Sequence, residues 1–173
     1  MSLFLVGMRG AGKSAAGALA GARLGVPFVD VDRAIEQSAG TSIATIFATQ
    51  GEAAFRALER QLLREILPRP VTLVALGAGA VAEPEARTAL RRYGRVVWLT
   101  ARYDVLHARI RGSDRPALSG LGARDEIAAL AVEREPLYRQ CADAQVGTSA
   151  LALEEVAHVI QRFWTALPHH QLR

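Results

Sequence analysis

The feature that most constrains this chain is its glycine-rich segment Gly7–Ser14, which fits the phosphate-loop pattern G-x-x-x-x-G-K-[ST] at every fixed position. The lysine of this segment, Lys13, is the only lysine among the twenty-one lysine and arginine residues of the chain. A phosphate loop needs glycines so that backbone N–H groups surround phosphate oxygens, and a compact ammonium group that reaches the β- and γ-phosphates. The pattern predicts a site for ATP or GTP.

The residues on either side of this loop have the order that a phosphate site requires. Ser2–Val6 is a short apolar run typical of a buried strand, and Lys13–Leu24 is rich in alanine and leucine and predicts a helix. The positive end of that helix faces the phosphates, and the Ser14 hydroxyl is a predicted ligand of Mg²⁺. The residues that we predict to contact the nucleotide here are Gly10, Ala11, Gly12, Lys13, Ser14 and Ala15.

Strands and helices alternate along the whole sequence, which predicts a parallel sheet with helices on both faces. The predicted strands are Ser2–Val6, Val26–Asp32, Val71–Leu76, Val96–Leu99 and Ala144–Val146. The predicted helices include Lys13–Leu24, Arg33–Ala39, Glu52–Leu67, Tyr103–Ile110, one that Asp125 caps, and a last helix from Leu153. With 173 residues, half of them hydrophobic, we expect one domain spanning residues 1–173.

Composition excludes several classes of function. No apolar run approaches the ~20 residues that span a bilayer, and the first strand leaves no room for a signal peptide, so we expect a cytoplasmic protein without membrane contact. The single cysteine, Cys141, forms no internal disulfide and is expected to be buried. The net charge is +4, but the arginines are scattered and aromatic residues make up only 6%, so nucleic acid is not a predicted partner. Anionic small substrates account better for the positive charge, and a monomer is expected.

Asp30 and Asp32 lie two residues apart at the end of the predicted strand Val26–Asp32. On a strand their side chains would point to the same face, near the carboxyl edge where open α/β sheets bind ligands. The structural alternative is that Asp32 caps a helix beginning at Arg33. We predict a functional role for both carboxylates, because two acids beside a phosphate loop repel each other unless a cation or a hydroxyl group lies between them.

Taken together, these motifs resemble those of shikimate kinases over nearly the whole chain. The matching segments are the phosphate loop 7–14, Phe28–Asp32 with Ile35-Glu36, Ile43, Ile46-Phe47, Gly51-Glu52, Phe55-Arg56, Glu59, Leu76–Val81, Asp114–Pro116 and Arg134–Tyr138. The resemblance implies a phosphate-loop kinase fold with a five-stranded parallel sheet, substrate-binding helices at about 33–67 and a mobile lid at about 111–124. It also implies transfer of the γ-phosphate of ATP to the 3-hydroxyl of shikimate, with Mg²⁺, in aromatic amino-acid biosynthesis.

The resemblance also assigns roles to individual residues. It implies that Asp32 binds the substrate hydroxyls and accepts a proton, and that Asp30 is associated with magnesium. Arg56 and Arg134 match the arginines that bind the shikimate carboxylate, a task suited to the planar guanidinium group. The remaining residues expected to contact the substrate are Gly77, Ala78 and Gly79.

Two further arginines and one departure complete the expectations. Arg115 matches the lid arginine that closes over the transferred phosphate, and Arg109 matches the arginine that stacks on adenine, with Arg111 as an alternative. Shikimate kinases are similar to one another in a run of three glycines after the third strand, whereas this chain has Ala78 in the middle. Alanine at that position would be strained if φ were positive, and its methyl group would narrow a pocket that the backbone lines.

Other functions remain open from the sequence. A kinase resembling gluconate kinase, or a nucleoside monophosphate kinase, would share the phosphate loop but not the pair Arg56 and Arg134. A non-catalytic nucleotide-binding module would keep the fold without turnover, and Ala78 is the only residue that favours it. Stimulation of ADP release by one acceptor would separate these alternatives.

Overall fold

The computed structural model describes residues 1–111 and 123–167 and contains one five-stranded parallel sheet. Its strands are β1 (Ser2–Val6), β2 (Phe28–Asp30), β3 (Leu73–Ala75), β4 (Gly94–Thr100) and β5 (Ala144–Gly147), in the spatial order β2-β3-β1-β4-β5. All four neighbouring pairs are parallel, with β1 between β3 and β4. The predicted fold class is confirmed.

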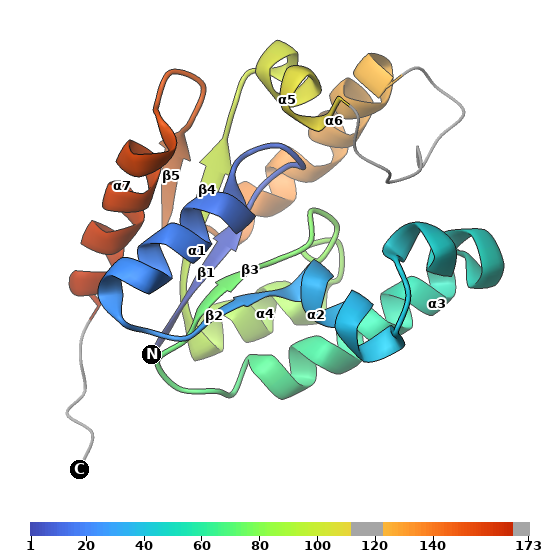
Figure 1. Ribbon diagram of the computed structural model, residues 1–173, viewed down its shortest axis with the longest axis horizontal. Coiled ribbons are helices and arrows are strands. Elements are labelled where there is room, and N and C mark those ends of the chain that lie inside the picture. The colour runs from blue at the N-terminus through green and yellow to red at the C-terminus, as the bar shows by residue number, and fades with distance from the viewer. Residues whose placement is uncertain (112–122, 168–173) are drawn as a thin grey trace.

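Helices cover the two faces of this sheet. They are α1 (Lys13–Leu24), α2 (Val31–Ala39), α3 (Ile43–Ile66), α4 (Pro84–Tyr93), α5 (Tyr103–Ile110), α6 (Ala123–Cys141) and α7 (Leu153–Thr165). Helices α1 and α7 pack side by side, whereas α4 packs against β4 and α6 (Figure 1). Helices α2 and α3 pack against each other on the side of the sheet where β2 is the edge strand (Figure 1). Helix α2 follows directly from the carboxyl end of β2.

The core is centred on β1, whose five residues are all buried. Small residues on α1 let this helix lie close to the sheet, because a Cβ atom at Gly17 would fall 2.5 Å from the Phe28 ring. Cys141 is buried in the core as expected, and burial raises the pKa of its thiol. Within the described residues, no helix is long and apolar enough to cross a membrane.

The region around Asp30 and Asp32 differs from the prediction. Strand β2 ends at Asp30, and Asp32 lies in the first turn of α2, so the two carboxylates do not share a face of one strand. Asp30, not Asp32, caps the helix: its Oδ1 accepts a hydrogen bond of 3.2 Å from the N–H of Arg33. The reason is physical, because an extended aspartate that satisfies a first-turn N–H ends the strand and starts the helix.

Other boundaries follow the sequence signals closely. Gly40 ends α2 with φ 65°, and the Ser42 hydroxyl accepts a hydrogen bond from the N–H of Thr45 at the start of α3. Gly51 interrupts α3 with φ 78° and ψ 174°, so this helix consists of two segments, the second of which corresponds to the predicted helix Glu52–Leu67. One boundary differs from the prediction: helix α6 begins at Ala123, so Asp125 lies in its first turn and does not cap it.

Candidate active site

The phosphate loop joins β1 to α1 in a conformation that depends on glycine. Gly7, Gly10 and Gly12 have φ values of 139°, 82° and 96°, which other residues adopt only with strain. The loop curls around the Lys13 side chain, whose Nζ donates to the carbonyl oxygens of Gly7 at 2.7 Å and Met8 at 3.0 Å. The ammonium group is thus buried at the positive end of α1, where phosphates are stabilised.

Arg109 lies against the outer side of this loop. Its Nη1 donates to the Gly10 carbonyl at 3.3 Å and to Thr148 Oγ1 at 3.0 Å, and its Nη2 donates to the Thr148 carbonyl at 2.8 Å. The Thr148 hydroxyl in turn donates to the Ala11 carbonyl at 3.1 Å. Arg109 is therefore fixed beside the phosphate loop, whereas Arg111 lies exposed just after α5. Sequence reasoning missed Thr148, because nothing in the pattern distinguishes a buried threonine that follows a strand.

A second group of charged residues is built on the later segment of α3. Arg56 pairs with Glu52 at 3.1 Å and with Glu59 at 2.7 Å, which lie one turn before and one turn after it on the same helix. Glu59 is buried, so the stronger contact holds the guanidinium group from within the protein. The pair with Glu52 alone would be typical of an exposed helix surface, and the buried contact with Glu59 shows that Arg56 is more than a surface charge.

The loop after β3 brings its backbone against these charges. A Cβ atom at Gly79 would lie 2.5 Å from both Nη atoms of Arg56, and one at Gly77 would lie 2.6 Å from Glu59 Oε1 and 2.9 Å from Asp32 Oδ1. Close approach, and not positive φ, therefore favours glycine at both positions, because a larger residue would displace these side-chain ends. Ala78 is half-buried and does not have positive φ, so the alanine that replaces a family glycine carries no backbone strain.

Oε1 of Glu59 and Nε of Arg134 are buried and have no hydrogen-bond partner within the described part of the chain. Arg134 lies on α6, and its charge acts on Glu59. Buried polar groups are nearly always satisfied in folded proteins, so an acceptor and a donor left open together are typical of a site for a polar ligand. Four different segments of the chain thus bring together Asp32, Arg56, Glu59, Gly77, Gly79 and Arg134.

This cluster adjoins the phosphate loop. The hydroxyl of Tyr138 donates to the Ala78 carbonyl at 2.6 Å and lies 3.8 Å from Met8 Sδ. A ligand held by the charged cluster would therefore lie close to the phosphates of a bound nucleotide. This arrangement suits direct transfer of a phosphoryl group, which depends mainly on positioning and on stabilising negative charge.

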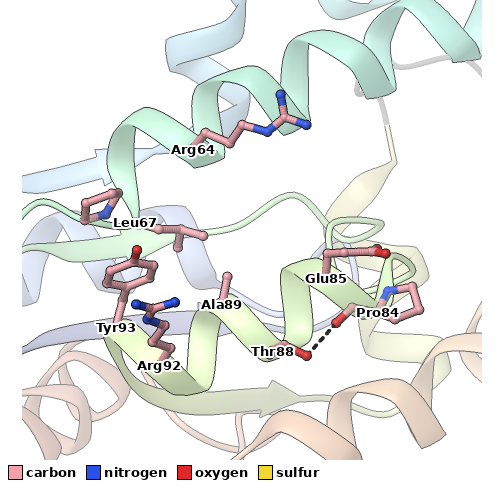
Figure 2. A pocket seen from close by; sticks show the side chains of 9 residues that line it. Arg64, Leu67, Pro84, Glu85, Thr88, Ala89, Arg92 and Tyr93 are labelled. Carbon is pink, nitrogen blue, oxygen red and sulfur yellow. Dashed lines mark hydrogen bonds between the residues drawn. The ribbon is translucent and has the colours of Figure 1, made fainter.

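The pocket in Figure 2 is a separate feature. It has a volume of about 530 Å³ and lies between the end of α3 and α4. Its lining consists of Arg64, Leu67, Pro68, Pro84, Glu85, Thr88, Ala89, Arg92 and Tyr93. It includes none of the residues that the sequence predicts to bind nucleotide or substrate.

Burial raises the pKa of the Glu59 carboxyl above its ordinary value, although the attraction of Arg56 opposes this change. Between the ordinary and the raised pKa, the folded protein holds a proton that the unfolded chain has released, so stability contributed by Glu59 falls as pH rises through that window. Glutamine does not titrate, so Glu59→Gln does not lose this stability. As the pH increases above about 4.5, we expect the free energy of unfolding of Glu59→Gln to rise relative to that of the wild-type protein. Urea denaturation at several pH values measures this difference, and a pH-independent difference would contradict it.

The fold and this site define a phosphate-loop kinase for a small polar acceptor. A sequence model of shikimate kinases matches residues 9–165, and the chain belongs to the shikimate kinase family. It is 42% identical over 159 residues to the shikimate kinase of Symbiobacterium thermophilum, and the aligned region covers 90% of this chain and 91% of the relative. It is 40% identical over 159 residues to that of Rhodopirellula baltica, covering 89% and 85% of the two chains.

Solved structures agree with this assignment. The shikimate kinase of Acinetobacter baumannii in complex with shikimate superimposes with a TM-score of 0.89 and 32% identity, covering 95% of this chain and 93% of that one. The shikimate kinase of Bacteroides thetaiotaomicron gives a TM-score of 0.84 and 30% identity, with coverage of 95% and 98%. The predicted family resemblance is confirmed.

Proposed function

We propose that this chain transfers the γ-phosphate of ATP to the 3-hydroxyl of shikimate, giving shikimate 3-phosphate and ADP in aromatic amino-acid biosynthesis. Its family and its relatives' activity support this function. The observation that carries it is the approach of Arg56 and Asp32 to the loop after β3, which adjoins the phosphate loop, together with the charge of Arg134 that acts on Glu59 in the same cluster. We further propose that residues 1–173 act as one domain, as a monomer, in the cytoplasm.

The substrate carboxylate is assigned to Arg56 and Arg134. Glu59 holds Arg56 at 2.7 Å and fixes the orientation of its guanidinium group, which a planar carboxylate needs for paired hydrogen bonds. Arg134 is 7% exposed, so its charge acts in a site with little water, where its attraction for an anion is strong. A second cation beside Arg56 also balances the negative charge of Glu59.

Asp32 is assigned to the acceptor hydroxyl. Its Oδ1 lies at the Gly77 backbone, on the side of the site where the charged cluster is found. A carboxylate there orients the nucleophilic oxygen and accepts its proton as the bond to phosphorus forms. Lys13 and the N-terminus of α1 stabilise the negative charge on the transferred phosphoryl group.

The residues present also fit a magnesium ion bound together with ATP. Magnesium in kinase sites is held by one or two protein oxygens, by substrate phosphates and by water. The Ser14 hydroxyl is exposed at the start of α1, and Asp30 uses only its Oδ1 in capping α2, so its Oδ2 is available. When bound, Mg²⁺ neutralises charge on the β- and γ-phosphates. No cluster of three or more metal-ligating side chains occurs in residues 1–111 and 123–167.

Two nucleotide contacts remain proposals from the sequence. Arg109 is assigned to the adenine ring, and its place beside Gly10 supports this role. Most of the expected lid at 111–124, with Arg115, lies outside the described residues. We propose that Arg115 closes over the transferred phosphate and helps to exclude water.

ADP release from Mg-ATP tests the proposed function, with shikimate, gluconate, AMP or no acceptor added to the purified protein. We expect strong stimulation by shikimate alone. Stimulation by gluconate or AMP would instead support another small-molecule kinase. Binding of ATP without stimulation by any acceptor would support a non-catalytic module and would make Ala78→Gly the next variant to assay.

Gly79→Ala tests the close approach between the loop and Arg56. The added Cβ would meet both Nη atoms at 2.5 Å, so the guanidinium group must move away from its position beside Glu59. We expect the KM for shikimate to rise about tenfold, the effect of losing roughly one charge-assisted hydrogen bond, with little change in the KM for ATP. Gly147→Ala is the matched control, because a Cβ atom there meets no atom within 4 Å. Equal effects of the two variants would contradict this explanation.

A further inference from the structure

Tyr138 is a buried side chain that connects three parts of the site. It lies on α6, four residues after Arg134, and its side chain is fully buried. Its ring packs against Trp98 with a centroid distance of 5.7 Å and an interplanar angle of 32°. The core thus fixes the ring, and the hydroxyl donates to the Ala78 carbonyl at 2.6 Å.

That hydrogen bond determines the direction of a neighbouring donor. The carbonyl of Ala78 and the N–H of Gly79 belong to one planar trans peptide group, in which they point in opposite directions. A bond that holds the carbonyl toward α6 therefore holds the Gly79 N–H away from α6. Gly79 lies against the Arg56 guanidinium group, and its N–H takes part in no hydrogen bond within residues 1–111 and 123–167.

The Tyr138 hydroxyl is suited to a permanent donor role. Burial raises its pKa, so it keeps its proton throughout the pH range in which the protein is assayed. The hydroxyl also lies 3.8 Å from Met8 Sδ, at the start of the phosphate loop, so it adjoins both loops of the site. Replacing the Tyr138 hydroxyl group with hydrogen, as phenylalanine does, would leave the Ala78 carbonyl without this donor while the ring remains in the core.

We propose that Tyr138 is a positioning residue, which fixes the Ala78–Gly79 peptide so that the Gly79 N–H donates to the substrate carboxylate beside Arg56. This inference rests on the proposed function, because it identifies how the same site binds its acid. Tyr138 itself does not touch the substrate. The carboxylate would then be held by two guanidinium groups and by one backbone donor whose direction the hydroxyl sets.

The test is Tyr138→Phe, assayed with shikimate and with its neutral carboxamide analogue. We expect the KM for shikimate to rise about five- to tenfold, as for the loss of one hydrogen bond, whereas the KM for ATP and kcat stay within about twofold. With the carboxamide the same variant should raise KM by a clearly smaller factor, because a neutral amide oxygen accepts a weaker hydrogen bond from the Gly79 N–H than a carboxylate oxygen does. Tyr103→Phe is the matched control. It removes an exposed tyrosine hydroxyl that donates to Glu135, a residue of α6, the helix that also carries Tyr138.

Three results for Tyr138→Phe would overturn the proposal. The KM for shikimate is unchanged, the KM values for shikimate and ATP rise equally, or the KM values for shikimate and the carboxamide rise equally. Thermal melting checks that the variant is folded. If it is not, the Gly79 amide resonance of the wild-type protein decides: a larger shift at saturation with shikimate than with the carboxamide supports the proposal, and equal shifts or no shift contradict it. Failure of the proposed function is distinct, because the wild-type protein would then show no shikimate-dependent turnover.

Discussion

Lys13→Ala is expected to lower kcat by at least about 10²- to 10³-fold, the effect of removing one preorganised donor to transition-state charge. The Lys13 ammonium group is held within the loop by the Gly7 and Met8 carbonyls at 2.7 and 3.0 Å, so it is already positioned before ATP binds. Phosphoryl transfer has little other chemistry for the protein to perform, which makes this charge the largest single contribution that we assign. The measurement is ADP release at saturating ATP and shikimate.

The fold should survive this substitution. The side chain pairs with loop carbonyls and not with the hydrophobic core, and Gly7, Gly10 and Gly12 set the loop conformation. Lys13→Arg keeps the charge but introduces a broad planar group, and we expect it to be similarly impaired. Arg23→Ala, in the last turn of the same helix, is the control and should leave turnover unchanged. Near-normal turnover of folded Lys13→Ala would refute the assignment of the phosphate loop.

Arg134→Ala is expected to raise the KM for shikimate by about 10- to 100-fold, as for loss of a charge-assisted hydrogen bond of 1.5–3 kcal/mol, with far less effect on the KM for ATP. Arg134 is almost fully buried, and its Nε has no partner among the described residues, so its capacity to bind an anion is not already used. Initial rates measured against each substrate separate the two KM values.

The matched control for this variant is Arg139→Ala. Arg139 lies on the same helix but is exposed, with its guanidinium carbon 5.8 Å from the centre of the Trp98 ring. Its removal tests whether loss of any arginine from α6 weakens binding through net charge alone. Equal increases of both KM values in Arg134→Ala, or equal effects of the two variants, would argue against a contact with the carboxylate.

Much of the fold could be predicted because its signals are local. Lys13–Leu24 and Tyr103–Ile110 are helices with the predicted bounds, since glycine and apolar periodicity mark their ends. The strand Val26–Asp32 was predicted too long, because Asp30 ends it by capping α2, and capping competes with strand formation over only a few residues. Local patterns do not decide which of two nearby aspartates forms the cap.

The candidate site was less accessible to sequence reasoning. The phosphate loop is contiguous and was found directly, whereas Arg56 and Arg134 were distinguished only by a family resemblance. Glu59 matched the family but was given no role, because its contact with Arg56 and the approach of Gly77 depend on tertiary packing. The roles of Thr148 and Tyr138 follow from hydrogen bonds that span 137 and 60 residues of sequence, which no local pattern predicts.

Identification of the phosphorylated product is the most direct test of phosphoryl transfer to the 3-hydroxyl of shikimate. The purified protein would be incubated with Mg-ATP and shikimate, and the product examined by phosphorus and proton NMR. We expect a phosphate ester whose phosphorus couples to the proton on carbon 3 of shikimate, formed in an amount equal to that of ADP. Phosphate on another hydroxyl, or inorganic phosphate released with ADP while shikimate remains unchanged, would contradict it.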